Sequence, residues 1–113
     1  MHRLTVVAAL LLVACRHQGL PGRYQQPDSM RAAVLHLVPI GSSVDTAQAR
    51  LEREGFRCAL THGPFAEHPA TDYLWCDATV GAGSPVTRRW QVAVFEDSGR
   101  VRDVAAKTGL IGP

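Results

Sequence analysis

The sequence has few aromatic residues, a single lysine and no basic cluster, and these shortages exclude several classes of protein. Aromatic residues make up 6% of 113 positions, and the twelve basic residues are eleven arginines and Lys107. The longest basic run is Arg88-Arg89. Because nucleic-acid binding proteins cluster basic residues to neutralise phosphates, we expect no nucleic-acid partner. The length allows one small domain and excludes a multidomain enzyme.

Motifs that carry catalysis or cofactor binding are also missing. The sequence contains no G-x-S-x-G, no H-E-x-x-H, no Walker loop and no G-x-G-x-x-G. Asp72 and Asp77 flank Trp75, but acidic residues beside strands are usually solvated rather than a catalytic pair. We therefore predict a protein that is not an enzyme and that uses no cofactor.

An apolar run follows the basic start of the chain. Residues 1–3 (MHR) precede residues 4–14 (LTVVAALLLVA), and Cys15 comes next. This order is typical of a secretory signal. The run is well short of the ~20 residues that a membrane-spanning helix needs, so we expect no permanent transmembrane anchor. An ordinary signal peptide with an incidental cysteine is one interpretation.

The residues that end this run resemble a bacterial lipobox. Leu12-Val13-Ala14-Cys15 matches that motif, in which the cysteine sulfur receives diacylglycerol before the leader is removed. The resemblance implies a signal peptide at 1–14 and membrane anchoring through lipid on Cys15. Lipoproteins kept at the inner membrane often have Asp at the next position, where this chain has Arg16. We therefore expect the cell envelope, at the outer membrane and facing the periplasm.

The segment after the lipidation motif is predicted to be a tether. Residues 18–27 (QGLPGRYQQP) contain Gly, Pro and Gln without apolar periodicity. We accordingly expect a lipidated cysteine and flexible tether at 15–27, followed by a single folded domain at 28–113.

Two cysteines remain for that domain. Cys58 and Cys76 each lie on the more apolar parity of a strand-like segment, and an exported chain favours their oxidation, so we predict a disulfide. The bridge would close a loop of about 19 residues, worth roughly 3 kcal/mol. A zinc site of Cys58, His62, His68 and Cys76 is the alternative. Its spacings match no zinc finger, so we predict no metal.

Two helices are predicted ahead of the strands. Residues 28–38 begin with a capping Asp28 and place apolar residues at helical spacing, although residues 33–38 also fit a buried strand. The second helix starts near Ser42, which has capping-box spacing to Asp45, and it ends at Gly55. One face of that helix is apolar and holds Val44, Ala47, Gln48 and Leu51.

Beyond Gly55 the apolar pattern alternates, which indicates strands. Strands are predicted at 56–60, 73–78, 88–95 and 100–106, with a hairpin turn at 96–99 and loops at 61–71 and 80–86. Trp90 is expected in the core, and the tail from Thr108 is expected to lie across the domain. The predicted fold class is α+β, with two N-terminal helices packed on one face of a three- to four-stranded antiparallel sheet.

Aromatic residues of the second predicted strand are the candidate binding surface. Tyr73, Trp75 and Asp77 have the parity opposite Cys76, so they lie on the open sheet face if the helices cover the cysteine. Arg89 of the third strand, with its neighbour Gln91, is expected nearby. Trp, Tyr and Arg commonly anchor protein interfaces. The alternative is cross-strand packing that only shields the sheet.

Short motifs within 28–106 resemble the BamE/SmpA-like small outer-membrane lipoproteins. They are the Gly41-Ser42-Ser43 turn, Leu51-x-x-x-Gly55-Phe56 at a helix end, and a terminal hairpin with Trp90 and Gly99. The strand count is similar to the repeat unit of β-lactamase inhibitory protein. The resemblance implies an α+β fold and an accessory role at the outer membrane.

Functions of three classes remain open. The first is a non-catalytic envelope lipoprotein that binds another envelope protein through the open sheet face, or that has a structural role. The second is an extracytoplasmic inhibitor of a hydrolase, acting through the loop at 61–71. The third is a metal-binding periplasmic protein.

Overall fold

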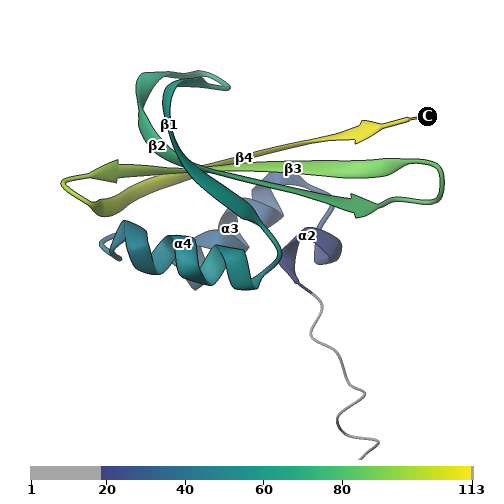
Figure 1. Cartoon of the computed structure of the whole chain (residues 1–113), viewed down its shortest axis with the longest axis horizontal. Coiled ribbons are helices and arrows are strands. Elements are labelled where there is room, and N and C mark those ends of the chain that lie inside the picture. The colour runs from purple at the N-terminus through teal and green to yellow at the C-terminus, as the bar shows by residue number, and fades with distance from the viewer. Residues whose placement is uncertain (1–18, 113) are drawn as a thin grey trace, which may run out of the picture.

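Figure 1 shows a computed structural model of the chain, which describes residues 19–112. Three helices come first: α2 (Leu20–Arg23), α3 (Pro27–Leu37) and α4 (Val44–Arg53). Four strands follow: β1 (Arg57–Phe65), β2 (His68–Gly81), β3 (Thr87–Asp97) and β4 (Arg100–Ile111). They form one antiparallel sheet in the order β1-β2-β3-β4. The predicted α+β class with a four-stranded antiparallel sheet is confirmed, but the described residues contain three helices where two were predicted.

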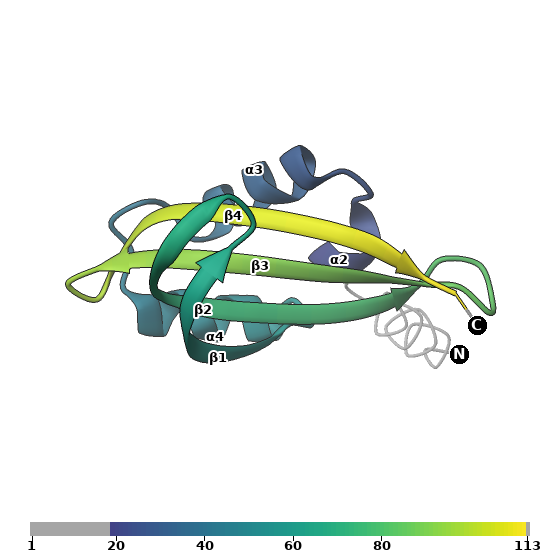
Figure 2. The same cartoon turned by 90° about the horizontal axis from the view of Figure 1, so that it is seen from above.

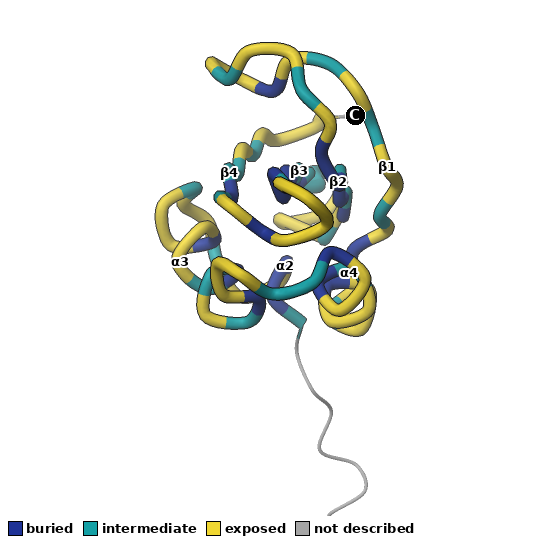
Figure 3. Tube along the Cα trace, turned by 90° about the vertical axis from the view of Figure 1, so that its left-hand side faces the viewer, coloured by how far each residue is buried: buried dark blue, intermediate teal, exposed yellow. Residues whose placement is uncertain are grey.

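The three helices lie on one side of the sheet, with α2 near the end of α4 and beside α3 (Figures 1 and 3). Their buried side chains form the main hydrophobic cluster with one face of the sheet. It includes Met30, Val34, Val44, Ala47, Leu51, Leu74, Cys76, Trp90 and Val92. Trp90 is fully buried, as predicted. Within residues 19–112 no helix combines the length and hydropathy needed to cross a membrane.

The ends of α4 follow local sequence signals. Ser43 is the N-cap, because its hydroxyl oxygen accepts a hydrogen bond of 3.1 Å from the backbone N–H of Thr46. The predicted cap one residue earlier is wrong: the Ser42 hydroxyl donates to the carbonyl of Pro39 at 2.6 Å. The helix ends near Gly55 as predicted, and the φ of +104° at this residue favours glycine.

The predicted flexible tether is wrong from residue 20 onward, because residues 20–23 form helix α2 and Pro27 begins α3. Leu20 is only 6% exposed, and the indole N–H of Trp90 donates to the carbonyl of Pro21 at 3.2 Å. Gly19 packs against the carbonyl of Glu54 with no room for a Cβ atom. A helix this short is stable only through such tertiary contacts, which leave no periodicity in the sequence. Cys15 and the leader at 1–14 lie outside the described residues.

An arginine from α3 holds the first half of the edge strand β4. Arg31 Nη2 lies 2.8 Å from Asp103 Oδ1, and Arg31 Nε donates to the carbonyl of Val104 at 2.8 Å. Burial alone would raise the pKa of Asp103, but the Val104 N–H donated to its carboxylate, the Arg31 guanidinium and the nearby His68 together outweigh burial. The pKa of Asp103 is therefore lowered from its ordinary value.

Two segments predicted as a loop and a tail are strand instead. Residues 61–65 and 68–71 extend β1 and β2 into a hairpin with a two-residue turn at Ala66 and Glu67. At the other end, β4 continues to Ile111, which pairs with Thr87. The tail therefore runs along the sheet edge, where Leu110 is 60% exposed. The predicted turn between β3 and β4 is confirmed within 96–99.

The β1–β2 hairpin curls over the sheet face opposite the helices (Figures 1 and 2). A register shift between Gly63 and Phe65 accompanies this bend. Near the tip, the ring centroid of Phe65 is 5.8 Å from that of Tyr73 and 6.5 Å from that of Phe95. These three residues and Ala93 are buried and form a second hydrophobic cluster. We call the sheet face beneath the curled hairpin the cupped face.

Candidate binding surface on the cupped face

A disulfide joins Cys58 of β1 to Cys76 of β2, as predicted. The two residues are direct partners in the strand register, with their Cα atoms 4.1 Å apart. Since both sulfurs are in this bond, the alternative zinc site has no thiolate to offer. Within residues 19–112, no group of three or more His, Cys, Asp or Glu residues is arranged to hold a metal ion. The bond ties the edge strand to the sheet where the hairpin leaves the helix layer.

Tyr73, one of the four predicted surface residues, is not available for binding. Along β2, Leu74 and Cys76 belong to the main cluster while Tyr73 belongs to the second, so the predicted alternation is confirmed. Tyr73 is nevertheless only 5% exposed, because Phe65 packs over it. The prediction that it lies on an open surface is wrong, since it assumed that residues 61–71 form a loop.

The other three predicted residues come together beside the second cluster. Arg89 Nε donates to Asp77 Oδ1 at 2.7 Å, and its guanidinium carbon is 5.9 Å from the centroid of the Trp75 ring. On Trp75 the indole N–H donates to Gln91 Oε1 at 3.2 Å. These contacts fix the orientation of a tryptophan that remains partly exposed. A pre-oriented aromatic side chain loses little conformational entropy when a partner packs on it.

Small residues surround Trp75 across the sheet. Its register partners are Ala59 on β1 and Ala93 on β3, and Ala93 pairs in turn with Ala105 on β4. The paired residues of an antiparallel sheet project from the same face. Trp75 is therefore the one large side chain in this row, which we call the alanine row. Ala93 is fully buried in the second cluster, and Trp75 and Ala105 pack against that cluster.

A polar row lies next to the alanine row on the same face. It consists of Arg57, Asp77, Gln91 and Lys107, one residue from each strand. Arg57 and Lys107 are exposed, and Lys107 Nζ lies 4.7 Å from the ring centroid of Phe65. With Arg89, three cations face the single carboxylate of Asp77. The polar row together with Arg89 therefore carries more positive than negative charge.

Sequence reasoning missed Arg57 and Lys107. Arg57 lies between Phe56 and Cys58 in the first predicted strand, and Lys107 lies beyond the predicted end of the last strand. The alternation of side chains along β4 places Lys107 on the same face as Ala105. Relating that face to Trp75 requires the strand register.

The two histidines of the hairpin have different surroundings. His62 Nδ1 lies 2.6 Å from Asp72 Oδ1, and both side chains are largely exposed. His68 stacks on Phe95 with ring centroids 4.5 Å apart, and its buried Nδ1 atom has no hydrogen-bond partner among the described residues. Stacking gives His68 a packing role beside the second cluster.

Comparison with known proteins leaves the predicted family resemblance untested. No family model, no curated protein and no solved structure matches this chain. The likeness to BamE/SmpA-like lipoproteins thus stays a prediction from short motifs.

Proposed function

We propose that this chain is a non-catalytic lipoprotein of the bacterial envelope that binds an envelope protein through the cupped face. The observation that carries the proposal is Trp75, partly exposed, held by Gln91 and Arg89, and flanked by alanines. A rigid tryptophan beside an arginine is the usual centre of a protein interface. The excess of positive charge around it favours an acidic surface on the partner.

The lipid anchor rests on the lipobox-like sequence before Cys15. Cys15 precedes Gly19 by four residues, so an extended chain separates their Cα atoms by at most about 14 Å. Each buried CH₂ adds ~0.8 kcal/mol to the free energy of membrane binding, so several acyl chains together hold the protein firmly on the membrane. The domain then stays close to the bilayer, at the outer membrane in our proposal.

The fold gives this anchored domain an orientation. The described chain starts at the helix side of the sheet, while the cupped face is on the opposite side (Figure 1). A short connection to the bilayer therefore turns the helix layer toward the lipid and leaves Trp75 accessible to a partner in the periplasm. A protein that reaches above the membrane surface fits this arrangement better than one buried within it.

The hydrolase-inhibitor function has less support from the fold. It required a free loop at 61–71, and this segment is a curled hairpin whose Phe65 side chain is 3% exposed. An inhibitory loop inserts outward-pointing side chains into a cleft. The hairpin instead directs its largest side chain toward its own sheet.

The test is capture of partners by the tagged full-length protein in its native host, followed by affinity measurement with the purified partner. Trp75→Ala should weaken binding roughly 30-fold, the factor that about 2 kcal/mol at an interface centre represents. Leu60→Ala is the matched control, because Leu60 is 73% exposed on the same hairpin with the opposite parity. Lys107→Glu should slow association and reduce its dependence on salt.

Equal affinities of the Trp75→Ala and Leu60→Ala proteins would refute the binding surface. The mass of the mature protein tests the anchor separately. Cleavage before Cys15 with added acyl mass supports it, and an unmodified cysteine or an uncut leader contradicts it.

A further inference from the structure

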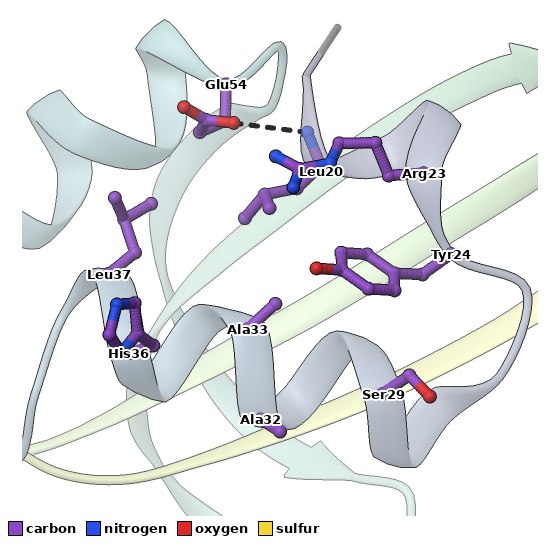
Figure 4. A pocket seen from close by; sticks show the side chains of 9 residues that line it. All are labelled: Leu20, Arg23, Tyr24, Ser29, Ala32, Ala33, His36, Leu37 and Glu54. Carbon is purple, nitrogen blue, oxygen red and sulfur yellow. Dashed lines mark hydrogen bonds between the residues drawn. The ribbon is translucent and has the colours of Figure 1, made fainter.

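A pocket of about 490 Å³ opens in the helix layer, on the side away from the cupped face. Figure 4 shows α2 on one side of it, α3 on the other and the end of α4 closing it. Its lining is mainly apolar, with Leu20, Tyr24, Ala33 and Leu37 around the space. Arg23, His36 and Glu54 lie among the polar lining residues. An apolar pocket with a few polar groups is the usual form of a small-ligand site.

A second pocket of the domain differs from the first because its lining is mostly polar. It lies between α2 and the far end of the sheet, and glycine backbone and Arg88 contribute to a mostly polar lining. An apolar ligand therefore favours the first pocket, which we call the helix pocket.

The start of the described chain is fixed at the helix pocket. The backbone N–H of Leu20 donates to Glu54 Oε1 at 3.2 Å, and Gly19 packs against the Glu54 carbonyl. Leu20 and Glu54 both line the pocket. The described chain therefore begins close to this pocket, and the four-residue separation of Cys15 from Gly19 corresponds to at most about 14 Å of extended chain.

We propose that the helix pocket receives a fatty acyl chain carried by Cys15 when the protein is away from a membrane. This inference rests on the proposed lipidation. Attachment so close to the pocket gives the acyl chain a high effective concentration there. When a bilayer is present, it buries the whole acyl chain and binds it more strongly than the pocket does, because each buried CH₂ adds to the transfer free energy. In water the pocket is the nearest apolar surface, so it shelters part of the chain.

Photocrosslinking of the full-length lipoprotein tests the proposal. Cells are grown with a fatty acid that carries a diazirine, and the purified protein is illuminated after detergent removal. Acyl adducts should map to Tyr24 and to residues 32–37 of α3. Adding vesicles of phosphatidylethanolamine and phosphatidylglycerol should remove them. Mixing isotopically labelled and unlabelled protein identifies adducts formed within one chain.

A pocket-filling variant provides the matched comparison. Ala33→Phe places a ring in the helix pocket and should lower the adduct yield about tenfold, because displacing even two buried CH₂ groups has that effect. Ala49→Phe adds the same ring on an exposed position of α4 and should leave the yield unchanged. Formation of the Cys58–Cys76 disulfide checks that both variants fold.

The outcomes separate the pocket from the proposed function. Adducts spread evenly over the chain, or found only between chains, would overturn the acyl pocket even if Ala33→Phe does not fold. An acylated Cys15 with no adduct on Tyr24 or α3 overturns the pocket and leaves the anchor intact. A mature protein without acyl mass contradicts the anchor, and the pocket then loses its proposed occupant as well.

Discussion

Gly19 lies so close to the backbone carbonyl of Glu54 that a methyl group on its Cα would overlap the oxygen. This contact fixes the start of the domain on the end of α4. We predict that Gly19→Ala displaces α2 and lowers the free energy of unfolding by about 1–3 kcal/mol, as overpacking typically does. Urea unfolding measures the change. Gly109→Ala, where an added Cβ meets nothing within 4 Å, is the control, and equal stability of the two variants would contradict the prediction.

Removing the disulfide should destabilise the domain more than removing most single side chains. The bond links residues 18 apart, and replacing Cys58 and Cys76 together by alanine should lower the free energy of unfolding by roughly 3 kcal/mol. The loss arises mainly because the unfolded chain gains conformational freedom. Denaturant titration of the double variant and of the reduced natural protein should give similar midpoints. A midpoint unchanged from that of the oxidised protein is the result that disagrees.

The curl of the hairpin depends on Phe65. Phe65→Ala removes the ring that covers Tyr73 and Phe95, so we expect a loss of about 3 kcal/mol and faster amide exchange in residues 61–71. Hydrogen exchange measured by mass spectrometry reports both. Leu60→Ala in the same hairpin should cost less than about 0.5 kcal/mol, because that side chain is largely exposed. Unaltered exchange at the tip would show that other contacts maintain the curl.

The Arg31–Asp103 pair should give a modest, pH-dependent stabilisation. Because folding lowers the pKa of Asp103, its contribution is present above the ordinary value of 3.8 and is lost as pH falls through the folded pKa. Both side chains are more than a third exposed, so Asp103→Asn should cost less than about 1 kcal/mol at pH 7. Near pH 2 the natural and variant proteins should approach equal stability. A difference that grows on acidification would be inconsistent with the lowered pKa.

Sequence periodicity predicted those elements whose pattern repeats within one segment. The apolar face of α4 was predicted from Val44, Ala47 and Leu51, which are all buried. The alternation of β3 likewise predicted a buried Trp90. Helix α2 and the hairpin tip escaped prediction because distant contacts maintain them. Gly19 meets Glu54, and Phe65 meets Phe95, and neither pair leaves a local pattern.

The candidate surface was predictable only in part for a similar reason. Parity along one strand placed Trp75 and Asp77 on the same face, and this placement holds. The alanine row and Lys107 depend on how four strands align, which parity within a single strand does not determine. Tyr73 was assigned to the surface because its cover comes from a segment that looked like a loop.

Strand β2 contributes side chains to two separate hydrophobic clusters. Successive side chains, Tyr73 and Leu74, enter separate apolar clusters on opposite faces of the sheet, and neighbouring Trp75 and Cys76 repeat this division. Because β2 contributes side chains to both clusters, a shift or twist of this strand that alters the packing of one cluster also alters the packing of the other. Any displacement of the Trp75 indole is therefore transmitted through a single backbone to the packing under the helices.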